Sequence, residues 1–557
     1  MEILNDSLPT INSASQKYLD QAFVDEFGLP SIVLMEQAAS AVTELILRLG
    51  NSGQKVLFLA GAGNNGGDAW TSARQLTAYG FEVSVLDIFP EKSLPSDAAQ
   101  NKNAFIKSLD YTNGRIFQLQ KFQLSSEPYD FIVDGIMGTG FNLARPLTQD
   151  IIFLLELVNA CEGTCRIAID IPTGIDSATG ACDQVVFLAD YTVTFSALKT
   201  GLAAEPGCAY TGEIIVALLS MQRSWLETKL IDFSKKSNLD SFLPRVLTLD
   251  TISHFEIERS ELSHKGNYGK TLLIGGSAGM SGAIILALQA AHATGVGYSY
   301  VRVPRILVAD LLAVSPESLI DAIPIDFSDN KDNTASLAAL DIKNETASIA
   351  AIDNWKKLIA EVDSVAIGPG AGQAEWLADN LDYISSATKR LIIDADGLNY
   401  LAEIENWQDV FQNRVLKEME PAILTPHPGE FKRLAPDLAE LLNLDRQAAA
   451  VELAKRSSTI IVLKGHATVL ALPSGEIYIN SSGNQSLAKA GSGDVLTGLL
   501  SGFTAQMTNQ TEAVALAVFF HGLLADIAVA DLGIRGVLPG KLPDYAADAY
   551  EKLGWQN

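Results

Sequence analysis

The sequence predicts an α/β protein built from two doubly wound, mostly parallel sheets. The first observation is length, because 557 residues are too many for one hydrophobic core and indicate two or three domains. The second is that short apolar runs alternate with stretches of helical spacing in both halves. The third is that the apolar runs lead into loops rich in glycine, proline and aspartate. In doubly wound sheets, ligands bind at the loops that follow the carboxyl ends of the strands.

The first half of the chain contains four apolar runs that predict parallel strands, at residues 55–60, 81–89, 129–133 and 166–171. Helical spacing occurs between them, at residues 68–79 and 151–160. Polar loops follow three of the strands, at residues 61–68, 134–140 and 170–176. Because these loops all follow strands of one parallel sheet, we expect them to gather at one edge.

The regular pattern breaks down after residue 221, where the chain is mixed and charged and has no clear strand. We place a linker at residues 226–249, between a domain at 1–225 and a domain at 250–557. A second α/β series follows, with strands predicted at residues 271–276, 298–304, 364–367, 390–393, 422–424 and 459–463. The polar segment 326–348 is expected to be a surface excursion.

Composition narrows the classes of partner. The net charge of −26 and a pI near 4.6 disfavour nucleic acids, which need a basic surface. The N-terminus lacks the features of a signal peptide, and the apolar run 513–525 predicts a buried helix too short to span a bilayer. The cysteines lack a zinc-site spacing and predict free thiols in a reducing cytoplasm; they are Cys161, Cys165, Cys182 and Cys208.

The glycine-rich turn GAGNNGGD follows the first strand at residues 61–68 and contains a formal G-x-G-x-x-G. Its glycines allow a sharp turn and a close approach to a ligand, and the following helix offers N–H groups to an anion. Asn64, Asn65 and Asp68 crowd this turn with polar groups, where a dinucleotide-binding turn has small apolar residues. The motif alone also fits a tight turn without a ligand.

Two further strand-end loops contribute oxygen atoms. VDGIMGTG places Asp134 at a strand end, and AIDIPTGID places Asp170 and Thr173 at another. Carboxylate, amide and hydroxyl oxygens from three loops are suitable ligands for a monovalent or divalent cation. Since this half contains no histidine, its proton chemistry must use a carboxylate, Lys, Tyr, Cys or water.

These motifs, together with LMEQAA at residues 34–39, resemble the NAD(P)H-hydrate epimerase family of the YjeF N-terminal type, over residues 10–225. The resemblance implies a Rossmann-like fold that interconverts the R and S epimers of NADH or NADPH hydrated at C6 of the nicotinamide ring. It implies a potassium ion at Asn65, Asp134 and Thr173, and Asp170 as the candidate acid or base. The implied substrate contacts are Asn64, Asn65, Gly66, Gly67, Asp68, Gly138, Thr139, Gly140, Phe141, Asn142, Leu143, Ala144 and Asp170.

In the second half, the run Gly491-Ser492-Gly493-Asp494 opens an apolar helix at residues 495–503. Its N–H groups and dipole can hold a phosphoryl group in transfer. Asp494 can then accept a proton from a substrate hydroxyl, although a plain helix cap is the alternative. His427 lies between two prolines, an unusual position in a core, so we expect it to contact a ligand.

Six ordered motifs resemble the ribokinase-like NAD(P)H-hydrate dehydratase family of the YjeF C-terminal type: NYGKTLLIGGSAGMSGA, IGPGAG, DADGLN, LTPHPGEF, LKGHATV and GNQSLAKAGSGDVLTG. The resemblance implies magnesium and an adenine nucleotide, ADP being expected in a fused chain, with release of AMP and phosphate. The implied catalytic residue is Asp494, and the implied substrate contacts are Ala283, Gly370 or Gly372, His427 and Asp494. The implied nucleotide contacts are Lys464, Gly465, His466, Ala467, Thr468 and Gly493.

Three alternatives remain at this point. The first alternative to hydrate repair is a small-molecule kinase with a regulatory N-terminal domain. The second is a non-enzymatic binding scaffold, and the third is a dehydrogenase in which Asp87 holds a ribose. HPGEF and KGHATV favour the dehydratase over the kinase, and the polar Asn64–Asn65 pair disfavours hydride chemistry. A cytoplasmic homo-oligomer that acts on small molecules, without nucleic acid or membrane, is expected from the family resemblance and the composition.

Overall fold

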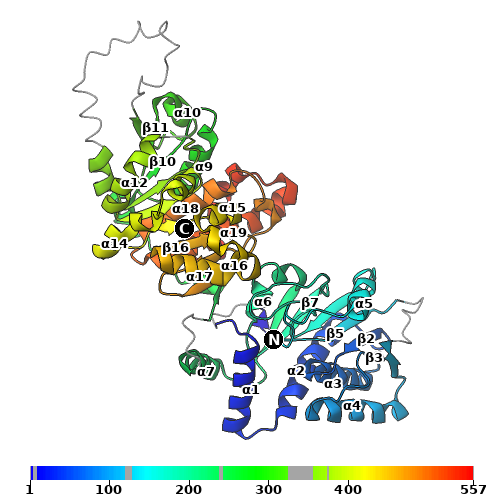
Figure 1. The fold of residues 1–557 in the computed structure, drawn as a ribbon. Helices are drawn as coiled ribbons and strands as arrows, with labels where there is room; N and C mark the ends of the chain where they lie inside the picture. The colour runs from blue at the N-terminus through cyan, green and yellow to red at the C-terminus, as the bar shows by residue number, and fades with distance from the viewer. Residues whose placement is uncertain are drawn as a thin grey trace, which may run out of the picture. The chain divides into compact units, whose positions relative to one another are not determined.

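The computed structural model describes residues 2–3, 9–119, 128–236, 243–323, 355–372 and 375–555, so the predicted excursion at 326–348 lies outside the described residues. The chain divides into two compact units, each with its own sheet (Figure 1). The first unit comprises Met1–Val246 with Leu444–Arg446, and the second comprises Leu247–Asn443 with Gln447–Asn557. The division after Val246 lies inside the segment 226–249, whose first part continues helix α7 (Arg223–Lys236).

The first unit is built on an eight-stranded sheet with the order β1-β8-β7-β6-β5-β2-β3-β4. Its strands are β1 (Glu2–Ile3), β2 (Lys55–Ala60), β3 (Glu82–Asp87), β4 (Arg115–Gln118), β5 (Phe131–Gly135), β6 (Cys165–Ile169), β7 (Tyr191–Phe195) and β8 (Glu213–Ala217). Neighbours are parallel except β1, which is antiparallel to β8. The carboxyl ends of β2, β5, β6 and β7 therefore share one edge, as the loop pattern predicts.

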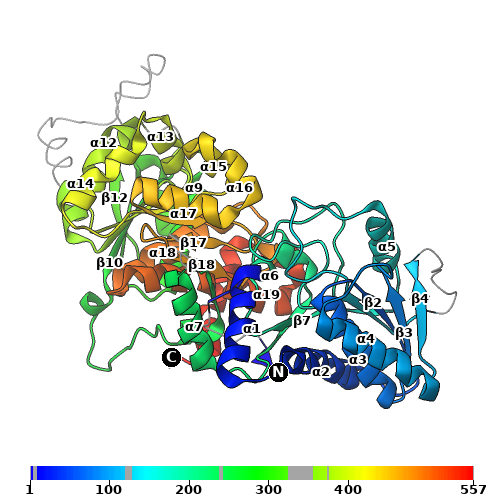
Figure 2. The ribbon, with the colours of Figure 1, turned by 60° about the horizontal axis from the view of Figure 1, so that its bottom comes forward.

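Helices cover both faces of this sheet (Figure 2). They are α1 (Ser13–Phe27), α2 (Ser31–Leu49), α3 (Asn64–Ala78), α4 (Ser96–Ser108), α5 (Gln149–Asn159), α6 (Thr200–Ala203) and α7. Side chains alternate along β2, so Val56 and Phe58 pack with α1, α2 and α3, whereas Leu57 and Leu59 pack with α5 on the other face. This two-sided burial explains why β2 is apolar without a break.

The second unit contains a ten-stranded sheet with the order β12-β11-β10-β13-β14-β15-β16-β17-β18-β9. Its strands are β9 (Arg245–Leu247), β10 (Lys270–Ile274), β11 (Tyr298–Pro304), β12 (Leu319–Ile323), β13 (Ser364–Ile367), β14 (Arg390–Ile393), β15 (Ile423–Leu424), β16 (Ile460–Leu463), β17 (Val469–Ala471) and β18 (Ile477–Asn480). The strands from β12 to β16 are parallel, and β16–β17 and β17–β18 are antiparallel hairpins. The α/β class with parallel sheets is thus confirmed.

The helices of the second unit form two layers on this sheet. They are α8 (Leu249–Ser253), α9 (Ser281–Ala293), α10 (Val308–Val314), α12 (Glu375–Ala387), α13 (Asp396–Glu403), α14 (Gln412–Leu416), α15 (Pro428–Leu434), α16 (Ala439–Leu444), α17 (Arg446–Ser457), α18 (Ser492–Gln506), α19 (Gln510–Gly536) and α20 (Ala546–Lys552). One apolar cluster contains α9, α18 and α19, and another contains α12, α13, α15 and α17.

Helix α19 corrects one prediction from sequence. The run at 513–525 predicts a buried helix too short to span a bilayer, but α19 continues past it, with a break in helical geometry at Gly533 (φ +67°), and is long and apolar enough to do so. Its apolar window is 72% buried inside the protein, and Val514, Phe520 and Leu524 belong to the core. The predicted length was wrong because Gly522 does not interrupt the helix: it packs against the backbone of Ser482. The predicted burial is confirmed.

The glycines of GAGNNGGD are required first of all by packing. A Cβ atom on Gly61 would lie 1.9 Å from the carbonyl oxygen of Ile136, and one on Gly66 would lie 2.0 Å from that of Gly61. The turn between β2 and α3 therefore touches the loop after β5 backbone to backbone. This contact brings two of the polar loops together. The glycines, for which the sequence suggests ligand contact, therefore also have a structural role.

We expect Gly61→Ala to lower the free energy of unfolding by about 2 kcal/mol or more, because no flexible side chain can move away from the added methyl group. Urea denaturation of the full-length protein measures the loss. Gly140→Ala is the matched control, since a Cβ there meets no atom within 4 Å, and we expect a change of at most about 0.5 kcal/mol. Equal stability of the two variants would contradict the packing argument.

Candidate active sites

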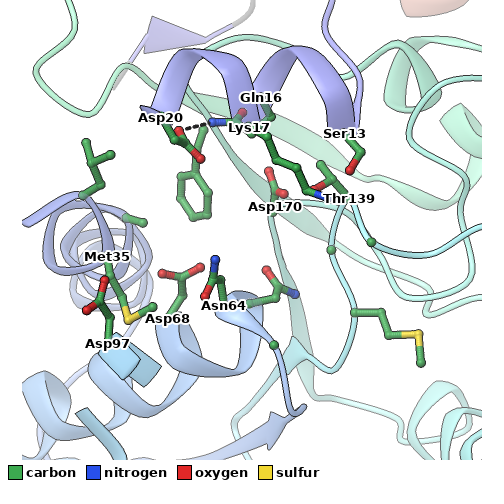
Figure 3. Close-up of a pocket in the computed structure, with 18 of the residues that line it drawn as sticks. Ser13, Gln16, Lys17, Asp20, Met35, Asn64, Asp68, Asp97, Thr139 and Asp170 are labelled. Atoms are coloured by element: carbon green, nitrogen blue, oxygen red, sulfur yellow. Dashed lines mark hydrogen bonds between the residues drawn. The ribbon is translucent and has the colours of Figure 1, made fainter. Parts of the chain in front are cut away.

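A cavity of about 510 Å³ lies in the first unit at the carboxyl edge of its sheet. The loops after β2, β5 and β6 form one side, and α1 and α2 contribute the other (Figure 3). Seven of the residues predicted from sequence line it: Asn64, Asn65, Asp68, Gly138, Thr139, Gly140 and Asp170. The volume is in the range of small-molecule sites.

Asn65 has the clearest unfilled bonding capacity in this cavity. It is only 9% exposed, and among the residues that the structure describes neither its Oδ1 nor its Nδ2 atom has a hydrogen-bond partner. Gly138 lies against it, since a Cβ on Gly138 would come within 3.1 Å of Asn65 Oδ1 and 3.2 Å of Asp170 Oδ2. Leaving a buried amide unpaired costs free energy, so this side chain is suited to a ligand or an ion.

Asp134 and Thr173 are fully buried and bonded to each other. Asp134 Oδ1 accepts hydrogen bonds from the Thr173 hydroxyl (2.8 Å) and from Ile136 N (3.0 Å), and Oδ2 accepts one from Thr173 N (2.7 Å). Burial raises the pKa of Asp134 to about 6, although these hydrogen bonds lower it. The pair ties the loop after β5 to the loop after β6, and neither residue is among those that line the cavity.

The remaining predicted contacts of this unit lie away from the cavity lining. Gly66 packs on Gly61, and a Cβ on Gly67 would meet Met35 at 2.5 Å. Phe141 is 4% exposed and belongs to the apolar cluster with α5. The next three residues, Asn142, Leu143 and Ala144, are exposed at the surface. The cavity thus brings together the central part of the predicted set and not its C-terminal end.

Asp170 forms a buried ion pair that the sequence did not reveal. Lys199 follows β7 and is 0% exposed; its Nζ lies 2.6 Å from Asp170 Oδ1 and also donates to Phe195 O at 2.6 Å. Thr194 donates a further hydrogen bond to Asp170 Oδ1 at 3.2 Å. Asp170 has a φ of +66°, a left-handed conformation of the kind found at functional sites. The strand-end rule could have indicated Lys199, which follows β7 as Asp170 follows β6.

Helix α1 contributes polar groups that sequence reasoning also missed. Gln16 and Asp20 lie one turn apart, and Gln16 Nε2 donates to Asp20 Oδ1 at 2.7 Å (Figure 3). Burial raises the pKa of Asp20 to about 6, while Gln16 and Lys199 lower it. Ser13 and Lys17 from the same helix also line the cavity. The polar i, i+4 spacing was the available signal, but it equally fits a solvated helix face.

Asp87, which a dehydrogenase would use to hold a ribose, is already paired. Lys102 Nζ lies 2.6 Å from Asp87 Oδ2, and the Asp87 side chain is 8% exposed. Lys102 also lies over the Trp70 ring, with 5.3 Å between its Nζ and the ring centroid. This ion pair therefore fixes α4 to β3, and neither Asp87 nor Lys102 is among the residues that line the cavity.

In the second unit, the loops after β14 and β16 meet the N-terminus of α18. Asp394 is 1% exposed, and its Oδ1 lies 2.7 Å from Lys464 Nζ and accepts from the Thr425 hydroxyl at 2.7 Å. Its Oδ2 accepts from the Thr497 hydroxyl on α18 at 2.6 Å. Although burial opposes ionisation, Lys464 and these hydrogen bonds lower the pKa of Asp394. Asp394 is thus a fixed anion that anchors Lys464.

Asp494 lies in the first turn of α18, beside this pair. Burial raises the pKa of Asp494 to about 6, Asp394 and Asp396 raise it further, and Lys464 lowers it. Gly491 has a φ of +99° and precedes the helix, and a Cβ on Gly493 would lie 3.4 Å from Lys464 Nζ. The predicted base and the predicted phosphate-binding glycines are therefore next to the partly buried Lys464 ammonium group.

The GPGAG loop packs on the glycine-rich turn before α9. Gly370 has a φ of +60°, and a Cβ on it would lie 2.9 Å from Ala283 Cβ. Gly372 has a φ of +62°, and its N–H donates to Asp396 Oδ2 at 2.8 Å. Ala283 and the two glycines that are candidates for substrate contact thus lie side by side, near Asp396 of the DADGLN motif.

His427 is the N-cap of α15. Its Nδ1 accepts from Gly429 N at 2.9 Å, and its side chain is 50% exposed. Glu430 returns the cap, accepting from His427 N at 2.8 Å, and lies 3.7 Å from Lys464 Nζ. The sequence motif HPGE is therefore a capping box that fixes the ring, and His427 Nε2 lies 3.5 Å from Glu430 Oε1.

The KGHATV segment forms the turn from β16 to β17. Gly465 and His466 are exposed, while Ala467 and Thr468 are buried and Gly465 N donates to Thr468 Oγ1 at 3.3 Å. His521 of α19 is a residue that the motifs did not indicate. Burial lowers the pKa of His521 to about 4, as does the charge of Lys464, and its Nε2 has no hydrogen-bond partner within the described ranges of the chain.

Two sequence models of known families match the chain. The model of the NAD(P)H-hydrate dehydratase family matches residues 271–547. The model of the YjeF-related protein N-terminus matches residues 31–201. The two matches lie in the second and the first unit respectively, so the fold and the sites define a two-domain α/β enzyme of the hydrate-repair class.

Full-length relatives cover both units. The bifunctional NAD(P)H-hydrate repair enzyme Nnr of Moorella thermoacetica is 33% identical over 96% of this chain and 95% of its own length. That of Escherichia coli K12 is 32% identical over 92% and 88%. The chain belongs to the family of bifunctional NAD(P)H-hydrate repair enzymes. A crystal structure of the Bacillus subtilis ADP/ATP-dependent NAD(P)H-hydrate dehydratase, co-crystallised with ATP/Mg²⁺, is 30% identical over 56% of this chain and 98% of that chain, with a TM-score of 0.45.

Proposed function

We propose that the first unit interconverts the R and S epimers of hydrated NADH and NADPH. The second unit then dehydrates the S epimer with ADP, releasing AMP and phosphate. One observation carries this proposal: each unit holds an Asp–Lys pair at the carboxyl edge of its own sheet, Asp170–Lys199 in one and Asp394–Lys464 beside Asp494 in the other. Two separate sites in one chain allow the epimerase to supply the epimer that the dehydratase consumes.

The epimerase site is the cavity between α1 and the strand-end loops. The nicotinamide ring would contact Asp170, and the helix N-terminus at Asn64 would face the substrate's anionic groups, which helix dipoles favour. Asn65, Asp134 and Thr173 would hold potassium; the unpaired buried Oδ1 of Asn65 fits such an ion, and the other two residues supply further oxygen atoms. The potassium ion would place a positive charge beside the bound substrate.

The dehydratase chemistry requires a better leaving group than hydroxide. Asp494 would take the proton of the C6 hydroxyl group. The hydroxyl oxygen would attack the terminal phosphate of ADP, with AMP leaving. Phosphate then leaves C6 with the bonding electron pair while a proton leaves C5, which restores the double bond. Lys464 and the N–H groups near Gly493 would hold the phosphates. Magnesium bound with the nucleotide would neutralise phosphate charge during the transfer.

We also propose a cytoplasmic location and a homo-oligomeric state. All four cysteines are free, which supports a reducing compartment. Size-exclusion chromatography coupled to light scattering would measure the oligomeric state. A monomer at micromolar concentration would reject the proposed homo-oligomer.

The decisive assay uses the purified full-length protein with mixed R and S hydrated NADH, potassium, magnesium, and either ADP or ATP. We expect complete return of reduced-nicotinamide absorbance with ADP and one AMP formed for each NADH. Recovery that stops when the S epimer is consumed would reject the epimerase, and no recovery with either nucleotide would reject the dehydratase.

The raised pKa of Asp494 predicts the pH dependence of dehydration. As a base, Asp494 works only when ionised, so kcat/KM should rise with pH through a midpoint near its pKa of about 6. Asp396→Asn removes a negative charge that raises this pKa, so the midpoint should move to lower pH. Initial rates of NADH formation from pH 5 to about 8 measure both profiles. A midpoint that stays constant or moves upward in Asp396→Asn would contradict the assignment.

A further inference from the structure

The cavity of the first unit holds more carboxyl groups than cations can neutralise at close range. Asp20 on α1, Asp68 on α3 and Asp170 after β6 face the same space (Figure 3). The ammonium group of Lys199 is bonded to Asp170, and its fully buried position leaves it no other carboxylate within ion-pair distance among the described residues. The cavity therefore contains carboxyl groups in two different electrostatic environments.

The environment of Asp68 differs from that of Asp170. Asp68 is 8% exposed, and within the part of the chain that the structure describes its carboxyl group forms no hydrogen bond or ion pair. Burial raises the pKa of Asp68 well above its usual value, and the nearby Asp170 and Asp20 charges raise it further. Asp170, by contrast, accepts from both Lys199 and Thr194. Environments that differ in this way separate an acid from a base.

Other charged groups around the cavity do not reverse this difference. The groups that line it or act on Asp68 are Lys17 and Asp20 on α1, Lys92 after β3, Asp97 on α4, Asp170 after β6 and Lys199 after β7. Lys199 is the cation that acts on Asp68, and its lowering effect is smaller than those of burial, Asp170 and Asp20.

We propose that Asp68 is the general acid and Asp170 the general base of the epimerase, and that Lys199 is the positioning residue that fixes the Asp170 carboxyl group in the cavity. This inference rests on the epimerase activity proposed above. It gives Asp68 a proton-transfer role in addition to substrate contact. It also gives the fully buried Lys199 a function in catalysis.

The proposed step balances as follows. Asp68 gives its proton to the C6 hydroxyl; the C6–O bond breaks and its electron pair leaves with water, while the lone pair of the adjacent ring nitrogen forms a C=N bond. Water then attacks C6 from the opposite face, the π electrons return to nitrogen, and Asp170 takes the proton. Proton transfer from Asp170 back to Asp68 through cavity water completes the cycle without net change. The reverse epimerisation uses the two carboxyl groups in exchanged roles.

The test measures R–S interconversion of hydrated NADH by chromatography, without nucleotide, so that no dehydration occurs. Asp68→Asn should lower kcat by about 10²-fold or more with a smaller effect on KM, and should remove the fall in rate at high pH. Lys199→Met should lower kcat by about tenfold or more with a smaller effect on KM, since the Asp170 carboxyl group loses the ammonium group that fixes its position. Lys199→Arg should restore kcat partly.

Asp87→Asn is the matched control, because Asp87 is also a buried carboxylate, its Lys102 partner lies at 2.6 Å, and it does not line the cavity. We expect it to keep epimerisation within about threefold. Urea denaturation of each full-length variant reports whether the first unit remains folded, because the substituted residues lie in that unit. An inactive wild type would reject the epimerase activity itself. An active wild type with Asp68→Asn changed only in KM, or with both limbs of its profile intact, would overturn the acid assignment.

Discussion

We expect Asp494→Asn to lose dehydration by about 10³-fold or more while R–S interconversion continues at the wild-type rate. The amide has nearly the size of the carboxyl group but cannot accept the hydroxyl proton. Asp394 and Lys464 keep their ion pair and hydrogen bonds in this variant, because Asp494 is not one of their bonded partners. The phosphate-binding surface should therefore remain, and the loss should fall on kcat.

The control for this experiment separates catalysis from helix stabilisation. Asp494 also lies where a negative charge favours the dipole of α18, an effect worth about 0.3–1 kcal/mol. Glu512 occupies the first turn of α19 in the same way, so Glu512→Gln should show the same small loss of stability with dehydration retained. NADH formation and AMP release are measured together. Asp494→Asn with a rate within tenfold of Glu512→Gln would leave Asp494 as a helix-stabilising residue only.

The converse variant, Asp170→Asn, should abolish epimerisation and leave dehydration of pure S epimer unchanged. The reason is that Asp170 lies in the cavity, where a Cβ on Gly138 would come within 3.2 Å of its Oδ2, and is the proposed proton-transfer group there. Recovery of NADH from a mixture should then stop once the S fraction is consumed. A variant that interconverts the epimers at the wild-type rate would remove Asp170 from the mechanism.

Stability must be controlled because Asp170→Asn leaves Lys199 buried without its counter-charge. Breaking a buried pair in this way costs about 3 kcal/mol. The double variant Asp170→Asn/Lys199→Met removes both charges, so its unfolding midpoint should recover toward the wild type. Epimerisation should stay absent in the double variant. If activity returned together with stability, the single variant would have failed through its fold and not through lost chemistry.

Much of the fold could be predicted from local pattern. β11, β13 and β14 have the bounds predicted from sequence, because each is a short apolar run closed on both sides by polar residues or glycine. β15 and β16 each begin one residue later than predicted. Helix α19 is longer than predicted because Gly522, a helix breaker by intrinsic propensity, is needed for close packing on Ser482.

The sequence by itself determined the two parallel sheets, the loops at their carboxyl edges and the place of Asp494 in the first turn of a helix. These features depend on periodicity and on residues a few positions apart. Only the tertiary structure decided that Lys199 pairs with Asp170. It also decided that Asp394, 70 positions from Lys464 and 103 from Thr497, is a fully bonded anion. Such pairs arise when strands distant in the chain become neighbours in a sheet, and burial then sets which carboxyl groups are ionised.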